Sequence, residues 1–176
     1  NIVEIYGTES SPSAKARSKG FHQALKNYPQ LHIIDTEYGN FDRVTAQKAM
    51  ENALVKTSDS HKSVQAVFAH SDEDGLGALQ AIKTAGLSPN DISIVSINGI
   101  QDVCKAIIAG EYLGTVESNP KWGIYCRNPD QSAGTGIHSI SYGDHPLQYY
   151  YRKQMPSAIF LLLINGILKE RRFQLL

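Results

Sequence analysis

The sequence predicts an α/β fold with a doubly wound parallel sheet. Three observations lead to this prediction. Apolar, strand-like segments alternate with amphipathic, helix-like segments over residues 1–117. Strand-like runs such as ISIVSI at 92–97 are apolar on both faces, so helices must cover both sides of the sheet. Each run also ends in a polar loop, and right-handed crossovers place these loops on one edge of the sheet, at 7–13, 37–41, 70–74, 98–101 and 117–120.

The first two strand–helix units are marked by capping residues. The alternating run at 2–6 is a strand ended by a glycine, and Ser11 or Ser13 fits the N-cap of the helix that follows. Leu31–Thr36 is the second strand, and the loop Glu37–Phe41 follows it. Asp42 fits the N-cap of a helix over 43–56.

The third unit, VQAVFAHSDEDGLGALQAIKTAG at 64–86, organises the rest of the chain. It predicts a buried strand at 64–69, a polar turn at 70–74 and then a helix whose apolar positions recur at helical spacing. In a parallel sheet, ligands bind where strands end and helices begin, because unpaired backbone N–H groups point there. Polar side chains gathered at this turn therefore indicate a small polar ligand.

The last two units complete the predicted sheet. A fourth strand at 92–97 ends at Asn98-Gly99, and a helix over 102–109 is closed by Gly110. A fifth strand covers 112–117 and ends at Ser118-Asn119-Pro120. From residue 124 to 157 neither helical nor strand periodicity is sustained, so no secondary structure is predicted there; residues 158–168 fit a short apolar helix.

Charge and composition limit the function classes. The 176-residue chain has no formal net charge, which argues against nucleic acid as its main partner. That total hides a division near residue 120, because residues 1–120 carry a net charge of −4 and residues 121–176 a net charge of +4. Five of the nine tyrosines also follow residue 120. The chain changes character at this point.

Cysteine spacing and apolar runs point to neither a metal site nor a membrane span. Cys104 and Cys126 have no metal-type spacing; separate thiols are favoured, and a disulfide between them stays open. The longest apolar run, at 158–164, is far shorter than the ~20 residues that cross a bilayer. The chain opens on a strand without a secretory signal, so we expect it to be a mature or truncated piece of a protein.

The side chains expected at the common sheet edge suit a sugar. Ser, Asn, Asp, Glu and Arg can saturate sugar hydroxyls with paired hydrogen bonds. Each candidate also has a structural alternative: a solvated helix charge for Arg17, an N-cap for Asp72 and turn chemistry for Asn98. Glu117 at a strand end fits either role. Motifs of serine hydrolases, zinc proteases and nucleotide-binding loops are absent from the sequence, so we expect no enzyme, no cofactor and no metal.

Three segments carry a resemblance to a known family. AVFAHSDEDGLGALQAIKTAG, then ISIVSINGIQD and KAIIAGEYLGTVESNP, together with the opening IVEIYGTESSPSAKARSKGFHQAL, resemble the sugar-binding proteins of bacterial ABC importers, of the ribose- and galactofuranose-binding type. The resemblance covers about residues 1–123. It implies two Rossmann-like α/β lobes with sugar held between them, of which this chain supplies the second.

The resemblance also assigns candidate site residues by position. Arg17 matches an arginine that reaches the sugar from the first helix of this lobe. Ser71 stands in the Asn position of an Asn-Asp-Glu motif that continues with Asp72, and Asn98 replaces an Asp at the end of the fourth strand. Glu117 or Ser118 lies where a polar residue at the last crossover contacts the ligand. The changes at 71 and 98 leave the identity of the sugar open.

The resemblance implies a transport function without chemistry. We expect binding of a monosaccharide or similar polyol, by hinge closure of two lobes, for delivery to an ABC permease. The protein is expected to be a monomer in the periplasm, or extracellular and lipid-anchored in a Gram-positive host. With half the cleft absent, the chain is expected to bind sugar weakly or not at all. The alternative is the effector domain of a LacI-type repressor, which shares the fold.

The resemblance ends abruptly after Asn-Pro-Lys-Trp-Gly at 119–123. Periodicity, charge and tyrosine content all change there. We hypothesise that residues 124–176 are translated out of frame or come from a foreign splice. A divergent but genuine tail is the alternative.

Overall fold

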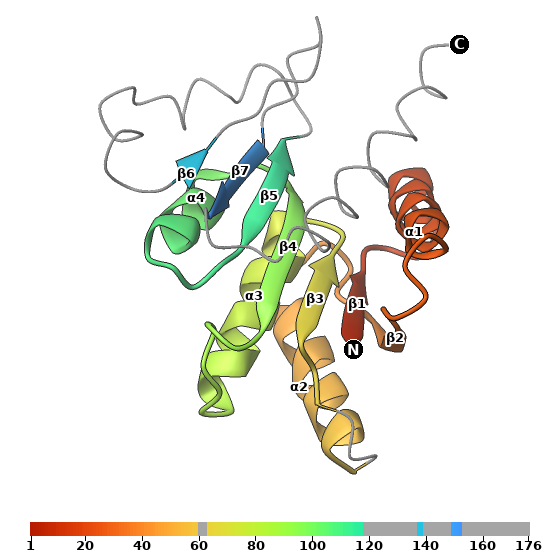
Figure 1. The fold of residues 1–176 in the computed structure, drawn as a ribbon, viewed down its shortest axis with the longest axis horizontal. Coiled ribbons are helices and arrows are strands. Elements are labelled where there is room, and N and C mark those ends of the chain that lie inside the picture. Colours follow the sequence, from red (N-terminus) through yellow and green to blue (C-terminus); the bar gives the residue numbers. More distant parts are fainter. Residues whose placement is uncertain (60–62, 118–136, 139–148, 153–176) are drawn as a thin grey trace, which may run out of the picture.

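The computed structural model describes residues 1–59 and 63–117, together with strand segments at 137–138 and 149–152. Its sheet has seven strands in the order β2-β1-β3-β4-β5-β7-β6 (Figure 1). Five of them are parallel, each paired with its neighbour: β1 Ile2–Tyr6, β2 Ile33–Tyr38, β3 Ala66–Ala69, β4 Ser93–Asn98 and β5 Gly114–Glu117. The predicted α/β fold with a parallel sheet is confirmed.

Helices cover both faces of the sheet, as the apolar strands require. They are α1 Pro12–Leu25, α2 Arg43–Asp59, α3 Asp72–Thr84 and α4 Gln101–Ile108. On one face, Phe21 of α1 stacks on Phe68 of β3, with ring centroids 4.0 Å apart. On the other face, α2, α3 and α4 pack Met50, Ile82 and Ile107 into a second apolar cluster. Burial of these side chains supplies most of the stabilisation, at roughly 25 cal/mol per Å² of apolar surface.

The strand order fixes where a ligand crevice forms. The chain runs from β1 outward to β2 on one side, then crosses to β3 on the other side and continues to β4 and β5. The crossovers therefore diverge between β1 and β3. In open α/β sheets, ligands bind outside the carboxyl ends of the strands at such a switch point.

Several predicted boundaries were wrong, for local reasons. The turn after β3 is shorter than expected, because Ser71 caps α3 through the N–H of Asp74 and the helix starts at Asp72. Asp72 is therefore not the N-cap. β2 begins two residues later than predicted and includes Glu37 and Tyr38, which pair in register with Ile5 and Tyr6 of β1.

The segment beyond residue 123 contributes strands that the sequence did not predict. β7 Tyr149–Arg152 pairs antiparallel with β5, and β6 Ile137–His138 pairs antiparallel with β7. The predicted helix at 158–168 lies outside the described residues, as does Ser118. Among the described residues no helix is both long and apolar enough to cross a membrane.

The expectation of separate thiols is wrong at Cys104. This residue lies buried in α4 and is disulfide-bonded. Cys126 lies outside the described residues.

Candidate ligand-binding edge

The carboxyl ends of the strands bring the predicted site residues to one edge of the sheet. Ser71 and Asp72 follow β3, and Asn98 ends β4. Glu117 ends β5 and is the direct register partner of Asn98. Arg17 comes from the second turn of α1, yet its guanidinium reaches the end of β3. The structure therefore brings residues from four separate segments together, as the crossover rule predicts.

Arg17 is held in place on two sides. Its Nη1 donates a hydrogen bond to the backbone oxygen of His70, the residue that follows β3. Its guanidinium also lies over the ring of Phe41, 5.8 Å from the centroid. This distance is within the range of a cation–π contact. Arg17 is thus a half-buried, oriented charge at the carboxyl end of β3, next to the switch point of the sheet, and not a solvated helix charge.

Ser71 is largely committed to the fold. Its Oγ accepts from the backbone N–H of Asp74 at 3.1 Å and donates to Asp74 Oδ2 at 2.8 Å. A hydroxyl has one proton and two lone pairs, so one lone pair of Ser71 Oγ remains after these two bonds. Any contact from this hydroxyl to a ligand is therefore limited to accepting one hydrogen bond.

Asp72 lies beneath the edge with both carboxylate oxygens engaged. Its Oδ1 accepts from Ser96 Oγ and, at 2.6 Å, from Thr115 Oγ1, while Oδ2 accepts from the N–H of Ile100 at 2.7 Å. The side chain is buried. Burial raises the pKa of Asp72, and the hydrogen bonds from Ser96, Thr115 and the backbone oppose that rise. This geometry favours a role in holding the loop after β4, and a direct ligand contact by Asp72 stays a prediction.

Asn98 stands on a turn that Asp72 and Thr115 organise. Its φ is 144°, a conformation that side chains rarely adopt, and Gly99 next to it has a φ of 78°. The N–H of Gly99 donates to Thr115 Oγ1 at 3.2 Å. One buried hydrogen-bond network, which joins α3, β4 and β5, therefore stabilises the turn. In this turn Asn98 is half-buried at the edge of the sheet.

A hydrogen-bonded system of Glu4, His70 and His22 supports the end of β3. Glu4 of β1 is 1% exposed and accepts from His70 Nε2 at 2.9 Å and from His22 Nε2 at 2.8 Å. Burial lowers the pKa of His70, so its neutral ring donates to the Glu4 carboxylate. Burial also acts to raise the pKa of Glu4, but the hydrogen bonds from His70 and His22 outweigh it and the pKa is lowered.

Sequence reasoning missed several residues that shape this edge. Phe41 supports Arg17, Thr115 carries the turn after β4, and Glu4 fixes the His70 ring. A signal existed for two of them. Glu4 and Thr115 are polar residues inside strands that are otherwise apolar, and buried polar groups need partners. Phe41 gave no such signal, because an aromatic residue in a polar loop is common on its own.

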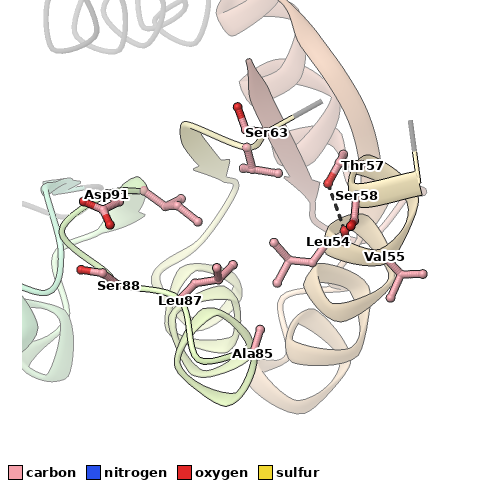
Figure 2. Close-up of a pocket in the computed structure, with 11 residues that line it drawn as sticks. Leu54, Val55, Thr57, Ser58, Ser63, Ala85, Leu87, Ser88 and Asp91 are labelled. Atoms are coloured by element: carbon pink, nitrogen blue, oxygen red, sulfur yellow. Dashed lines mark hydrogen bonds between the residues drawn. The ribbon is translucent and has the colours of Figure 1, made fainter. Parts of the chain in front are cut away.

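Neither a metal cluster nor the cavity described next belongs to this edge within the described residues. Within the described ranges, no cluster of three or more His, Cys, Asp or Glu side chains could hold a metal ion. A cavity of about 710 Å³ lies at the opposite edge, where β3 and β4 begin (Figure 2). Leu54 near the end of α2 and Leu87 after α3 line it. It is therefore separate from the carboxyl-end edge, where the predicted site residues lie.

Comparisons with known proteins place these residues in a family context. The family described as periplasmic binding protein domain matches residues 1–125. The galactofuranose-binding protein YtfQ of Escherichia coli (strain K12) is 41% identical over 121 residues, which are 68% of this chain and 38% of that protein. The ribose import binding protein RbsB of the same strain is 34% identical over 138 residues, 78% of this chain and 41% of that protein.

The chain is also similar to a solved structure of a periplasmic binding protein. It is the periplasmic binding protein component of the arabinose ABC transporter from Shewanella sp. ANA-3, bound to alpha- and beta-L-arabinofuranose. It matches with a TM-score of 0.64 and 38% identity, over 75% of this chain and 42% of that chain. The chain thus spans about two fifths of the length of the curated relatives it matches.

Proposed function

The chain belongs to the periplasmic binding protein domain family, and from this premise we propose that it forms the second lobe of a substrate-binding component of a carbohydrate ABC importer. Its ligand is a monosaccharide or a similarly small polyol, which a first lobe would enclose from the other side. The named relatives support this class, because their names specify galactofuranose and ribose. The alternative of a LacI-type repressor domain gains no support from these relatives.

One observation carries the proposal. Arg17 is oriented by the His70 carbonyl and the Phe41 ring at the switch point of the sheet, on the same edge as the paired ends of β4 and β5. A fixed guanidinium donates to several oxygens in one plane. Asn98 and Glu117 add an amide and a carboxylate of the type that accepts from sugar hydroxyls. The apolar ring of Phe41 suits the C–H face of a sugar.

The proposed mechanism is binding and release, without a chemical step or a cofactor. Two lobes close over the ligand about a hinge, and a membrane permease receives it. We propose that sugar binding takes place in the periplasm, or at the cell surface on a lipid anchor in a Gram-positive host. We propose that the binding protein is a monomer. Residues 1–123 form the lobe, and the family match ending at residue 125 supports a boundary there. An out-of-frame origin of 124–176 stays a hypothesis.

Saturation-transfer NMR on the purified chain tests the ligand class. The panel is D-ribose, L-arabinose and xylitol, with glycine and a short neutral peptide as control compounds. We expect any transfer to fall on a sugar or polyol and none on the controls, with a dissociation constant weaker than about 1 mM, because one wall of the cleft binds alone. Equal transfer to sugars and controls would contradict the proposal, whereas transfer to none of the compounds matches the expectation that one wall of the cleft binds weakly or not at all.

A further inference from the structure

We propose that Tyr6, the last residue of β1, is a positioning residue for this site: its ring keeps the backbone oxygen of His70 directed at Arg17. The inference rests on the proposed function, since it gives Tyr6 a part in orienting the arginine that would bind sugar. Tyr6 is half-buried and lies at the carboxyl end of β1, where the crossovers diverge.

The pairing of two strands places His70 beside the end of β1. β1 and β3 are parallel neighbours in the sheet (Figure 1), and the His70 N–H donates to the Ile5 oxygen at 3.0 Å. Side chains alternate between the two faces of a strand, so Glu4 and Tyr6 project from the same face of β1. On this face His70 Nε2 donates to Glu4 Oε1 at 2.9 Å. Glu4 and Ile5 thus hold one ring nitrogen and the backbone nitrogen of His70.

The Tyr6 ring packs against the His70 ring. The two centroids are 4.4 Å apart, with 45° between the ring planes. The Phe68 ring, from β3 itself, lies 5.4 Å from the His70 ring. Aromatic rings at such separations attract each other. Because His70 is 0% exposed, removal of the Tyr6 ring would leave a space beside it into which the His70 ring can turn.

The backbone of His70 connects this ring packing to Arg17. The His70 oxygen accepts a hydrogen bond from Arg17 Nη1. Each side-chain rotamer is compatible with only part of the backbone torsion range, so a turned ring favours a different direction of the His70 peptide. Ile5 holds the N–H side of His70, which leaves its carbonyl side freer to move. Tyr6 therefore acts on Arg17 through His70.

The same end of β1 also holds the loop that carries Phe41, the second support of Arg17. The Tyr6 oxygen accepts from the Gly39 N–H at 2.7 Å. The Phe41 ring fills the space above Gly7, where a Cβ would lie 2.2 Å from two ring atoms. These contacts involve backbone atoms of Tyr6 and Gly7, and a substitution of the Tyr6 side chain leaves those atoms in the chain. Such a variant therefore tests the His70 support by itself.

Tyr38 offers a matched control, because its ring is the next one along the same row. It is the register partner of Tyr6 on β2, and the two ring centroids are 5.4 Å apart. Tyr38 is 46% exposed, and among the described residues its ring contacts Tyr6 and not His70. Loss of the Tyr38 ring should therefore leave His70 in place.

Nuclear magnetic resonance of the whole chain, without sugar, tests the proposal. The quantity measured is the order parameter of the Arg17 Nε–H bond, which reports how tightly the guanidinium is held. The parent chain should give about 0.8, and Tyr6→Ala should give less than about 0.6. Tyr6→Phe keeps the ring and Tyr38→Ala keeps the His70 contact, so both should match the parent chain. Hydrogen exchange at Gly39 should be unchanged in Tyr6→Ala, because its acceptor is a backbone oxygen.

Four outcomes would overturn the proposal. They are a mobile Arg17 in the parent chain, a parent-like order parameter in Tyr6→Ala, an equal loss of order in Tyr38→Ala, and a loss of order in Tyr6→Phe. If Tyr6→Ala does not fold, Tyr6→Leu, which keeps apolar volume without the flat ring, takes its place with the same expected loss. Sugar takes no part in these measurements, so they can fail while the sugar-binding test succeeds, and the reverse.

Discussion

The guanidinium of Arg17 donates a hydrogen bond to the backbone oxygen of His70, and so joins the second turn of α1 to the end of β3. The His70 ring is in turn fixed by Glu4 from the neighbouring strand β1. Arg17 is therefore connected to the two strands between which the crossovers diverge.

Removal of the Arg17 side chain should weaken sugar binding and leave the fold nearly intact. Arg17→Ala deletes charge-assisted hydrogen bonds, each worth about 1.5–3 kcal/mol, so saturation transfer to the bound sugar should fall at least about tenfold. The free energy of unfolding should change by less than about 1.5 kcal/mol. Lys15→Ala, an exposed cation on the same helix, should change neither quantity. Equal losses of saturation transfer in both variants would show that Arg17 acts only by adding positive charge to the helix, and not by a specific contact with the sugar.

Glu4→Gln should destabilise the chain by about 1–3 kcal/mol at pH 7 in urea unfolding, because the buried His70 ring loses a charged acceptor. His22→Gln should cost less, since His22 is 51% exposed. An equal loss of unfolding free energy in the two variants would contradict the view that the buried Glu4–His70 contact contributes more to stability than the exposed His22 contact.

The same system should make the chain sensitive to acid. Glu4 has a lowered pKa in the folded state, so its contribution is present at neutral pH and is lost as pH falls through that pKa. His70 has a pKa below its ordinary 6.5, so the unfolded chain takes up this proton first, and stability falls further as pH drops below about 6.5. Unfolding free energies measured from pH 8 to pH 4 in an Asp74→Asn background, which lacks the opposing titration of Asp74, should therefore decrease. A flat profile would contradict this account.

Asp74 should produce the opposite pH dependence. Its pKa is 3.8 in the unfolded state and about 7 in the folded state, so the folded chain holds the extra proton and this contribution falls as pH rises through that window. Asp74→Asn removes the effect. The variant should gain about 1–3 kcal/mol over the parent chain at pH 8 and less at pH 5. An equal difference at the two pH values would contradict a titrating Asp74.

Thr115→Val should loosen the turn that presents Asn98. The substitution keeps the shape of the side chain but leaves the Gly99 N–H and one Asp72 oxygen short of a partner, at a cost of about 1–3 kcal/mol. Hydrogen exchange at Gly99 should accelerate. Thr36→Val, at an exposed position of β2, serves as the control. Unchanged exchange at Gly99 in Thr115→Val would show that the turn does not depend on this network.

The sequence predicted the order of the elements because each parallel strand has a distinct apolar run and each helix a distinct period. The predicted boundaries were wrong where polar residues lie inside a strand or a helix. Tyr38 lies in an edge strand with one exposed side, and Asp72 begins a helix that Ser71 caps. β7 was missed because its partner, β5, lies more than thirty residues earlier in the chain. Pairing over such a distance leaves no local pattern.

The sequence predicted where the candidate site residues lie better than it predicted what their side chains do. Strand order alone places Asn98 beside Glu117 and brings Ser71 to the same edge. Roles depend on side-chain contacts, which residue types do not specify. Asp72 has the chemistry of a sugar ligand, yet its oxygens are engaged with Ser96, Thr115 and Ile100. Phe41 was not anticipated, because its contact with Arg17 depends on how the loop after β2 folds back.

We expect the carboxyl-end edge of this sheet to form one wall of a sugar site. The most direct test is chemical-shift mapping of the ¹⁵N-labelled chain with the sugar that gives the strongest saturation transfer. We predict shifts at the Arg17 side chain and at the amides of Ser71 and Gly99, with little change elsewhere in the described residues. Shifts gathered instead around Leu54 and Leu87, at the opposite edge, would contradict the claim, and so would the absence of any shift up to the solubility limit of the sugar.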